Sequence, residues 1–149
     1  CWMLIDEYKL PLDLNTVIKY ALVHDLVEVY AGDVSMYANY DQKEKERSER
    51  ESLLKLKENF PGQVSLWEVI ETYEARKDEE SKFVYIIEKL EPVLSALVSE
   101  EYYWTKRGIT FEEFFERKQK KIASLESFAQ NFNLELMDYL RKNSSKFFK

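Results

Sequence analysis

Residues 21–33 of the chain read ALVHDLVEVYAGD, and this stretch decides how the rest of the sequence is interpreted. It holds the one histidine among 149 residues, His24, directly followed by Asp25. Apolar residues alternate with the charged ones at helical spacing, and no glycine or proline interrupts them before Gly32. The pattern predicts an amphipathic helix that is capped by Asp13 or Asn15 and stops at Gly32.

Three potential metal ligands or acid–base groups fall within one stripe of this predicted helix. Residues three and four positions apart share a helix face, so Ala21, His24, Asp25 and Glu28 gather on one side. A partly buried histidine that contacts the backbone is the structural alternative for His24. Its neighbours favour a functional patch.

The carboxylates of this stretch lack a nearby cation in the sequence. Asp25 and Glu28 lie close to the negative end of the predicted helix dipole, and Asp33 follows just past its end. Lys19 is the only lysine or arginine between residues 12 and 42. Three carboxylates gathered there repel one another, so we expect a bound divalent metal to compensate them. The apolar residues around them predict a packed helix whose acids line a crevice.

Mixed imidazole and carboxylate ligands suit manganese, cobalt, iron, nickel or zinc better than calcium. Such a metal polarises a phosphoryl oxygen and lowers the pKa of a bound water. Glu28 stands one turn from His24, where it can orient or deprotonate that water, or protonate the leaving oxygen. The spacing therefore indicates metal-assisted hydrolysis.

The rest of the sequence predicts helices and no strand. Three glycines and three prolines leave few of the tight turns that a β-sandwich or barrel requires. With 45% hydrophobic residues in 149, we expect one compact domain, an all-α bundle of five to seven helices. Besides the helix described above, the predicted helical ranges are 1–10, 41–59, 64–75, 79–101 and a last stretch after Thr110.

Four details of these helices are predicted. The charged first half of 41–59 is expected to face solvent, while Leu53, Leu54 and Leu56 anchor the second half. Pro92 is expected to kink or divide its helix. Thr110 with Glu113 forms a capping box, and a break near residues 131–133 splits the last stretch. Residues 33–40 are expected to form a loop.

Composition limits the functional classes. The formal net charge of −6, with acids and bases interleaved, argues against a large non-specific nucleic-acid surface. Cys1 is the one cysteine, so neither an intrachain disulfide nor a cysteine zinc cluster is expected, and a cytoplasmic location is the simplest interpretation. No apolar run is long enough for a membrane span. The chain opens within an apolar helical pattern, so we expect part of an N-terminal helix to be missing.

The stretch 21–33 resembles the core motif of the HD-domain phosphohydrolases, in the branch of the bacterial 5′-deoxynucleotidase and its eukaryotic relatives. A second stretch agrees: Tyr73-Glu74 precedes residues 81–84, SKFV, and residues 88–92, EKLEP. The resemblance covers about residues 1–110. It implies a helical, usually dimeric protein that uses a divalent metal to hydrolyse phosphomonoesters such as nucleoside 5′-monophosphates.

The resemblance also implies roles for particular residues. His24 and Asp25 match the metal-binding pair, Glu28 the acid–base glutamate, and Asp33 the aspartate at the substrate-facing loop, with a catalytic and substrate-binding role. Glu88 stands where the family has a metal-binding aspartate. It either ligates the metal directly or through water, or is an ordinary exposed glutamate beside Lys89. The family's upstream histidine ligand has no counterpart, which a missing N-terminal segment explains.

Three functions remain open on this basis. The first is a metal-dependent phosphohydrolase acting on a nucleotide-like phosphomonoester. The second is a degenerate HD domain that serves as a binding or scaffold module, and the absent histidine and the glutamate at position 88 favour it. The third keeps the enzyme but changes its substrate to a diphosphorylated signalling nucleotide.

Overall fold

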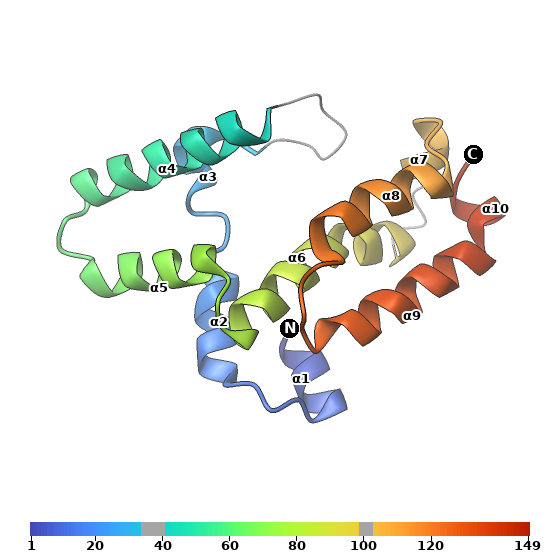
Figure 1. Cartoon of the computed structure of the whole chain (residues 1–149), viewed down its shortest axis with the longest axis horizontal. Coiled ribbons are helices and arrows are strands. Elements are labelled where there is room, and N and C mark those ends of the chain that lie inside the picture. Colours follow the sequence, from blue (N-terminus) through green and yellow to red (C-terminus); the bar gives the residue numbers. More distant parts are fainter. Residues whose placement is uncertain (34–40, 99–102) are drawn as a thin grey trace. The chain divides into compact units, whose positions relative to one another are not determined.

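The computed structural model describes residues 1–33, 41–98 and 103–149, and within these ranges the chain forms α-helices and no strand (Figure 1). The all-α prediction is confirmed. None of these helices combines the length and the hydrophobicity that crossing a bilayer requires. The helices are α1 (Trp2–Tyr8), α2 (Leu14–Val23), α3 (Glu28–Ala31), α4 (Gln42–Asn59), α5 (Val64–Ala75), α6 (Glu79–Val98), α7 (Tyr103–Lys106), α8 (Phe111–Ile122), α9 (Ala129–Lys142) and α10 (Ser144–Phe147).

Three of these helices, α3, α7 and α10, have only four residues, and the other seven of the described ranges have seven or more. The five to seven helices expected from the sequence correspond to the long ones. The loop expected at residues 33–40 lies, apart from Asp33, outside the described residues.

The contacts divide the chain into two compact units. One comprises residues 12–81 with Trp2, and in it α3 packs on α4 and α2 packs on α5. The other comprises Cys1 with residues 3–11 and 82–149, and in it α9 contacts both α8 and α10. The candidate residues at positions 24, 25, 28 and 33 all belong to the first unit.

The predicted helix starts are confirmed at two places by their caps. Asp13 Oδ2 accepts a hydrogen bond from the backbone N–H of Thr16 at 3.0 Å, at the start of α2. Thr110 Oγ1 accepts one from the backbone N–H of Glu113 at 3.2 Å, at the start of α8. Each bond satisfies an amide that has no carbonyl partner within its own helix.

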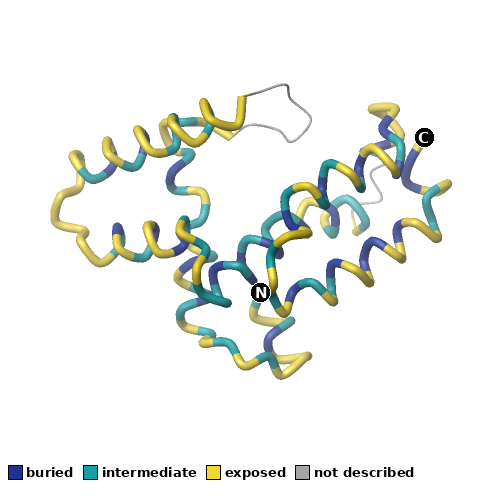
Figure 2. The backbone as a smooth tube through the Cα atoms, in the orientation of Figure 1, coloured by how far each residue is buried: buried dark blue, intermediate teal, exposed yellow. Residues whose placement is uncertain are grey.

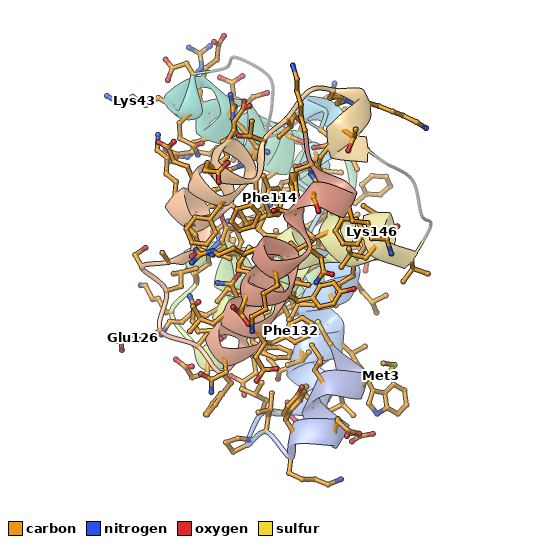
Figure 3. The ribbon with its side chains drawn as sticks, turned by 90° about the vertical axis from the view of Figure 1, so that its right-hand side faces the viewer. Met3, Lys43, Phe114, Glu126, Phe132 and Lys146 are labelled. Atoms are coloured by element: carbon orange, nitrogen blue, oxygen red, sulfur yellow. The ribbon has the colours of Figure 1, made fainter. Side chains whose placement is uncertain are left out.

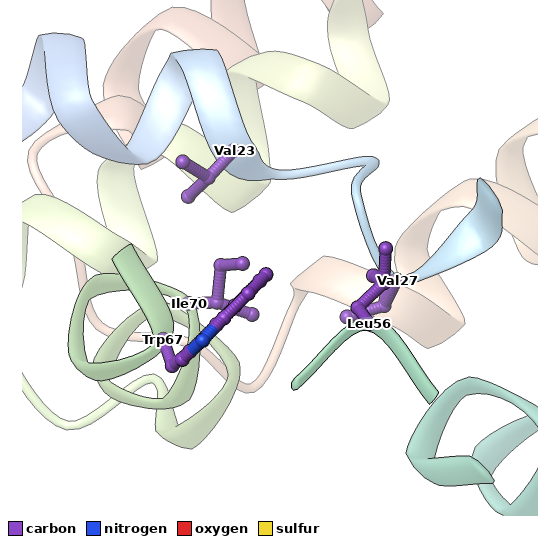
Figure 4. Packing of buried hydrophobic residues seen from close by; sticks show 5 residues of the cluster. All are labelled: Val23, Val27, Leu56, Trp67 and Ile70. Carbon is purple, nitrogen blue, oxygen red and sulfur yellow. The ribbon is translucent and has the colours of Figure 1, made fainter. Parts of the chain in front are cut away.

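The core of the first unit joins three helices and the segment between α2 and α3 (Figure 4). Ile70 from α5 is fully buried in it, and Trp67 lies one turn earlier on the same face. The other buried members are Val23, Val27 and Leu56. Burial of these side chains is the main favourable term that positions the segment around His24.

Most of α4 is exposed, as the charge run predicts, but not all of it (Figure 2). Leu56 is buried and Leu53 is partly buried, whereas Leu54 has 57% of its surface exposed. The prediction that Leu54 anchors α4 is therefore wrong. Leu53 and Leu56 are three residues apart and share a face, while Leu54 points away from it.

The core of the second unit is rich in aromatic rings. Trp104 stacks on Phe148 with ring centroids 4.8 Å apart and contacts Phe114 edge-on at 5.2 Å. Phe114 lies in the interior of the unit, whereas Met3 on α1 projects outward (Figure 3). The C-terminal residues thus complete a core that α7 and α8 begin.

The long helix α6 continues past Pro92 and is not divided there. Near this residue, the ammonium of Lys118 donates a hydrogen bond to the backbone carbonyl of Lys89. Burial lowers the pKa of Lys118 to about 8. Because proline has no N–H, Pro92 donates no hydrogen bond to the carbonyl of Glu88 four residues earlier. The Lys118 ammonium binds the adjacent carbonyl, that of Lys89.

The break expected near residues 131–133 is at residues 123–128 instead, between α8 and α9. Gln130 Nε2 donates to the backbone carbonyls of Ile122 at 2.6 Å and Leu125 at 2.8 Å. Asn133 is fully buried within α9 and donates to Gln130 Oε1 at 3.2 Å. The asparagine therefore fixes the glutamine that caps α8, and does not mark the break itself.

We predict that Ile70→Ala destabilises the protein by about 2–5 kcal/mol, because it leaves a cavity in the core of the first unit. Leu54→Ala is the matched control on α4. Since Leu54 is exposed, its truncation should change the free energy of unfolding by less than about 0.5 kcal/mol. Urea denaturation measures both, and equal costs for the two variants would contradict the described packing.

Gly32 ends α3 with φ +80°, which side chains rarely adopt, although an added Cβ would meet no atom within 4 Å. Gly32→Ala should therefore destabilise the protein by about 1–3 kcal/mol through backbone strain alone. Gly62 is equally uncrowded and has no left-handed φ. The control Gly62→Ala should be neutral or stabilise by up to about 1 kcal/mol in the same urea experiment.

Candidate metal and acid–base site

The predicted single helix around the histidine is divided in two. Residues 24–27 form consecutive turns between α2 and α3 (Figure 1). The amide of Leu26 donates to the carbonyl of Val23 at 3.0 Å, and the amide of Glu28 donates to that of Asp25 at 2.9 Å. Both bonds span three residues rather than four, so the chain winds more tightly here than in an α-helix.

His24 itself takes part in this change of winding. Its Nδ1 lies 2.8 Å from the carbonyl oxygen of Ala21. In an uninterrupted helix that oxygen would accept from the backbone amide of Asp25. The side chain competes for the acceptor, which is a local reason for α2 to end at Val23. The backbone contact considered for this histidine in the sequence is thus present.

The same contact sets the direction of the second ring nitrogen. A carbonyl oxygen only accepts, so Nδ1 carries the proton and donates it. Nε2 then lies 3.0 Å from Asp25 Oδ2. The two side chains converge, although an ideal helix would separate neighbouring residues by about 100°.

This pair fits a cation. When the imidazole is neutral, Nε2 and Oδ2 are two acceptor atoms facing each other, and only a proton or a metal ion between them makes the arrangement favourable. The histidine side chain is 29% exposed and the aspartate 62%, so the pair is open to solvent on one side. Orientation of a ligating histidine by a carbonyl at its other nitrogen is usual in metal sites.

Glu28 is the first residue of α3, and its carboxylate forms an ion pair with a lysine of α4. Its Oε1 accepts from Lys45 Nζ at 3.3 Å, and the same ammonium lies 3.2 Å from Glu49 Oε1. Burial raises the pKa of Glu28, the Lys45 ammonium opposes that rise, and the Asp33 and Asp25 carboxylates add to it. The three acids of the motif are thus electrostatically coupled.

Lys45 corrects the charge argument made from the sequence. Lys19 is the only lysine or arginine within residues 12–42, and a metal was the expected compensation. The fold brings a lysine from outside that interval onto Glu28. We therefore expect a bound metal at the pair of His24 and Asp25 rather than at the whole set of acids.

Two further expectations about this segment need correction. Leu22 and Val29 are exposed, so the helix is not packed on all its apolar positions. The acids were also expected to line a crevice, but Asp33 is exposed. It directly follows Gly32, which has a positive φ and whose amide donates to the carbonyl of Glu28 at 2.7 Å. This hydrogen bond ends α3 at Gly32, so Asp33 lies just beyond the helix that Glu28 begins.

Glu88 lies on α6 in the other unit of the chain. Its side chain pairs with the ammonium of Lys89, and both side chains are largely covered. The interpretation of Glu88 as an ordinary exposed glutamate is therefore wrong on exposure but right on its lysine partner. The Glu88 carboxylate also opposes the lowering of the Lys118 pKa.

In the described residues, no three histidine, cysteine, aspartate or glutamate side chains gather closely enough to hold a metal ion by themselves. His24 and Asp25 supply two converging donors. Glu28 was predicted as an acid–base group rather than a ligand, and its pairing with Lys45 agrees with that separation of roles. Lys45 was missed because nothing in a charged run marks one lysine as inward-facing.

Comparison with known proteins places this chain in a family. Its closely matching relatives include 5′-deoxynucleotidase HDDC2 of Mus musculus, 34% identical over 87 residues, and that of Xenopus laevis, 32% identical over 115 residues. These alignments cover 57% and 76% of this chain, and 44% and 55% of the relatives. The chain thus spans about half the length of the curated relatives it matches.

A third relative, 5′-deoxynucleotidase hdd1 of Schizosaccharomyces pombe, is 33% identical over 82 residues, which cover 51% of this chain and 41% of that protein. No solved structure matches the chain. The family model described as HD domain matches residues 1–128. This range covers the whole of the first unit and part of the second. The chain therefore belongs to the HD domain family.

Proposed function

We propose that this protein is a divalent-metal-dependent phosphohydrolase that acts on a nucleoside 5′-monophosphate or a similar phosphomonoester. The observation that carries the proposal is the convergence of His24 Nε2 and Asp25 Oδ2 at 3.0 Å, one turn before the Lys45-paired carboxylate of Glu28. The relatives named 5′-deoxynucleotidase support the substrate class.

His24 and Asp25 are the proposed metal ligands. Imidazole suits nickel, iron and zinc, whereas carboxylate suits manganese and magnesium. These metals and cobalt are the candidates, and experiment decides among them. A bound divalent metal would supply Lewis-acid polarisation of a phosphoryl oxygen. Nδ1 of His24 stays protonated on the Ala21 carbonyl and keeps Nε2 directed at the metal position.

Glu28 is the proposed acid–base residue. Its Oε1 is engaged by Lys45, so we assign proton transfer to Oε2. There it deprotonates the attacking water or protonates the leaving nucleoside oxygen. Partial burial raises its pKa, and the Asp33 and Asp25 carboxylates add to that rise against the opposing Lys45 ammonium. A raised pKa favours a carboxyl that both accepts and donates a proton.

Asp33 is proposed to contact the substrate and to assist catalysis. It is exposed at the end of α3, and the left-handed Gly32 fixes the point at which it leaves the helix. An acid in this position suits hydroxyl groups of a sugar, to which a carboxylate is a strong acceptor. The same carboxylate disfavours further phosphates beside it, which ranks the diphosphorylated nucleotide lower as a substrate.

The remaining proposals concern the protein as a whole. We propose that residues 1–149 are part of a single HD domain, that the protein acts in the cytoplasm, and that it is a homodimer with no nucleic-acid or membrane partner. The single cysteine supports the reducing location. The dimer rests on the family resemblance.

We predict that His24→Ala lowers phosphate release from deoxyadenosine 5′-monophosphate more than about 100-fold. Mutation of a residue that only hydrogen-bonds to a metal ligand already lowers activity about 10–100-fold, and loss of a ligand itself should cost more. Lys19→Ala, an exposed position on the same helix α2, is the matched control and should act like the wild type. The assay uses manganese or cobalt, with a diphosphorylated nucleotide as competing substrate. Unchanged activity in the histidine variant would contradict the assignment of His24 as a metal ligand.

The role of Glu88 is tested by metal affinity. If Glu88 is a ligand, Glu88→Gln should weaken Mn²⁺ binding at least about tenfold, while Glu88→Asp, which matches the family, should bind Mn²⁺ as well as or better than the wild type. Calorimetric titration of the purified chain measures both. Equal affinity in all three proteins would exclude Glu88 as a ligand. No metal binding and no activity in the wild type would favour the scaffold alternative.

A further inference from the structure

The charged helix α4 contains one lysine with an environment unlike that of a surface residue. Lys45 has a side chain only 17% exposed, and it lies between two carboxylates, Glu28 on α3 and Glu49 on its own helix, which are 20% and 21% exposed. Arg47, two residues further on, pairs with Glu51 while both side chains remain mostly exposed. The first arrangement is enclosed, and the second is an ordinary surface pair.

Both contacts of Lys45 are at ion-pair distance. Its Nζ is 3.3 Å from Glu28 Oε1 and 3.2 Å from Glu49 Oε1. Glu49 is one turn along α4 from Lys45, so it directs the lysine side chain towards α3. Burial by itself lowers the pKa of Lys45, but the carboxylates of Glu49 and Glu28 outweigh that effect and leave it above its ordinary value. The ammonium is therefore charged at neutral pH.

Other contacts between α3 and α4 support this position of Glu28 beside Lys45. The backbone amide of Tyr30 donates to Ser52 Oγ at 3.3 Å, and Asn59 Nδ2 donates to the Tyr30 hydroxyl at 3.0 Å. Lys55 Nζ lies 4.1 Å from the centroid of the Tyr30 ring. A four-residue helix has little stability of its own, so α4 determines where α3 and its first residue lie.

We infer that Lys45 is a positioning residue for the reaction proposed above, holding the Glu28 carboxylate in place while Glu49 holds Lys45. The inference rests on the proposed function. Lys45 does not need to touch the substrate. Its ammonium fixes one carboxylate oxygen of Glu28 and so orients the other, and catalytic rates depend steeply on such placement.

The first experiment is a kinetic double-mutant cycle on the full chain with Mn²⁺ and deoxyadenosine 5′-monophosphate. Lys45→Met should lower kcat about tenfold or more with little change in KM, and Lys45→Arg, which keeps the charge, should recover much of it. Glu28→Gln should lower kcat about 100-fold or more. Adding Lys45→Met to Glu28→Gln should cost little further, because the group that Lys45 positions is already lost.

Two controls separate positioning from folding. Lys43→Met removes an exposed lysine from the first turns of the same helix and should leave kcat unchanged. Glu49→Gln should lower kcat less than Lys45→Met, since it loosens the lysine without removing it. A Lys45→Met protein as active as the wild type, beside an inactive Glu28→Gln, overturns the inference and leaves the proposed function standing.

A stability cycle with the same variants does not depend on activity. In the wild type, Glu28→Gln removes an attraction to Lys45, whereas in Lys45→Met it relieves repulsion between two uncompensated carboxylates. The shifts of the urea midpoints should therefore be non-additive, and additive shifts overturn the pairing itself. If the wild type releases no phosphate with any metal, the proposed function fails, while this cycle still decides whether Lys45 holds Glu28.

Discussion

The contact between α3 and α4 is the constraint on which the candidate site depends. The segment that carries His24, Asp25 and Glu28 contains only tight turns and one four-residue helix, which hydrogen bonds alone stabilise poorly. Contacts with neighbouring helices determine its position: Val27 is buried against residues of α4 and α5, and Lys45 of α4 forms an ion pair with Glu28. The short elements of the candidate site are thus positioned by contacts with a long neighbouring helix.

The tight winding at residues 24–27 gives the pair its geometry. In a regular helix, two consecutive side chains point in directions about 100° apart, and converging on one ion requires bending of both side chains. Here the histidine takes a carbonyl from the helix ladder, the turns span three residues, and Nε2 comes to 3.0 Å from Oδ2. A short stretch of this winding within a helical region often accompanies function.

Electrostatics divides the motif into two parts. The Glu28 carboxylate pairs with the Lys45 ammonium, whereas His24 and Asp25 pair with each other and are partly open to solvent. This division agrees with the separate roles that the family resemblance implies for the pair and for the glutamate. Glu88, paired with Lys89 in the other unit, belongs to a different local environment, and its role is a question of metal affinity rather than of exposure.

The sequence by itself determined the helical class, most helix boundaries and the caps at Asp13 and Thr110, because periodicity and capping are local properties. It also predicted that His24, Asp25, Glu28 and Asp33 belong to one site, from their spacing and the family resemblance. Periodicity did not reveal where the helix divides, because it does not show whether the His24 side chain competes locally for the Ala21 carbonyl. Tertiary packing then holds the divided segment, through Val23 and Val27 against Leu56, Trp67 and Ile70. It alone selected Lys45 from a run of charged residues, because which lysine is covered depends on the helix packed against it.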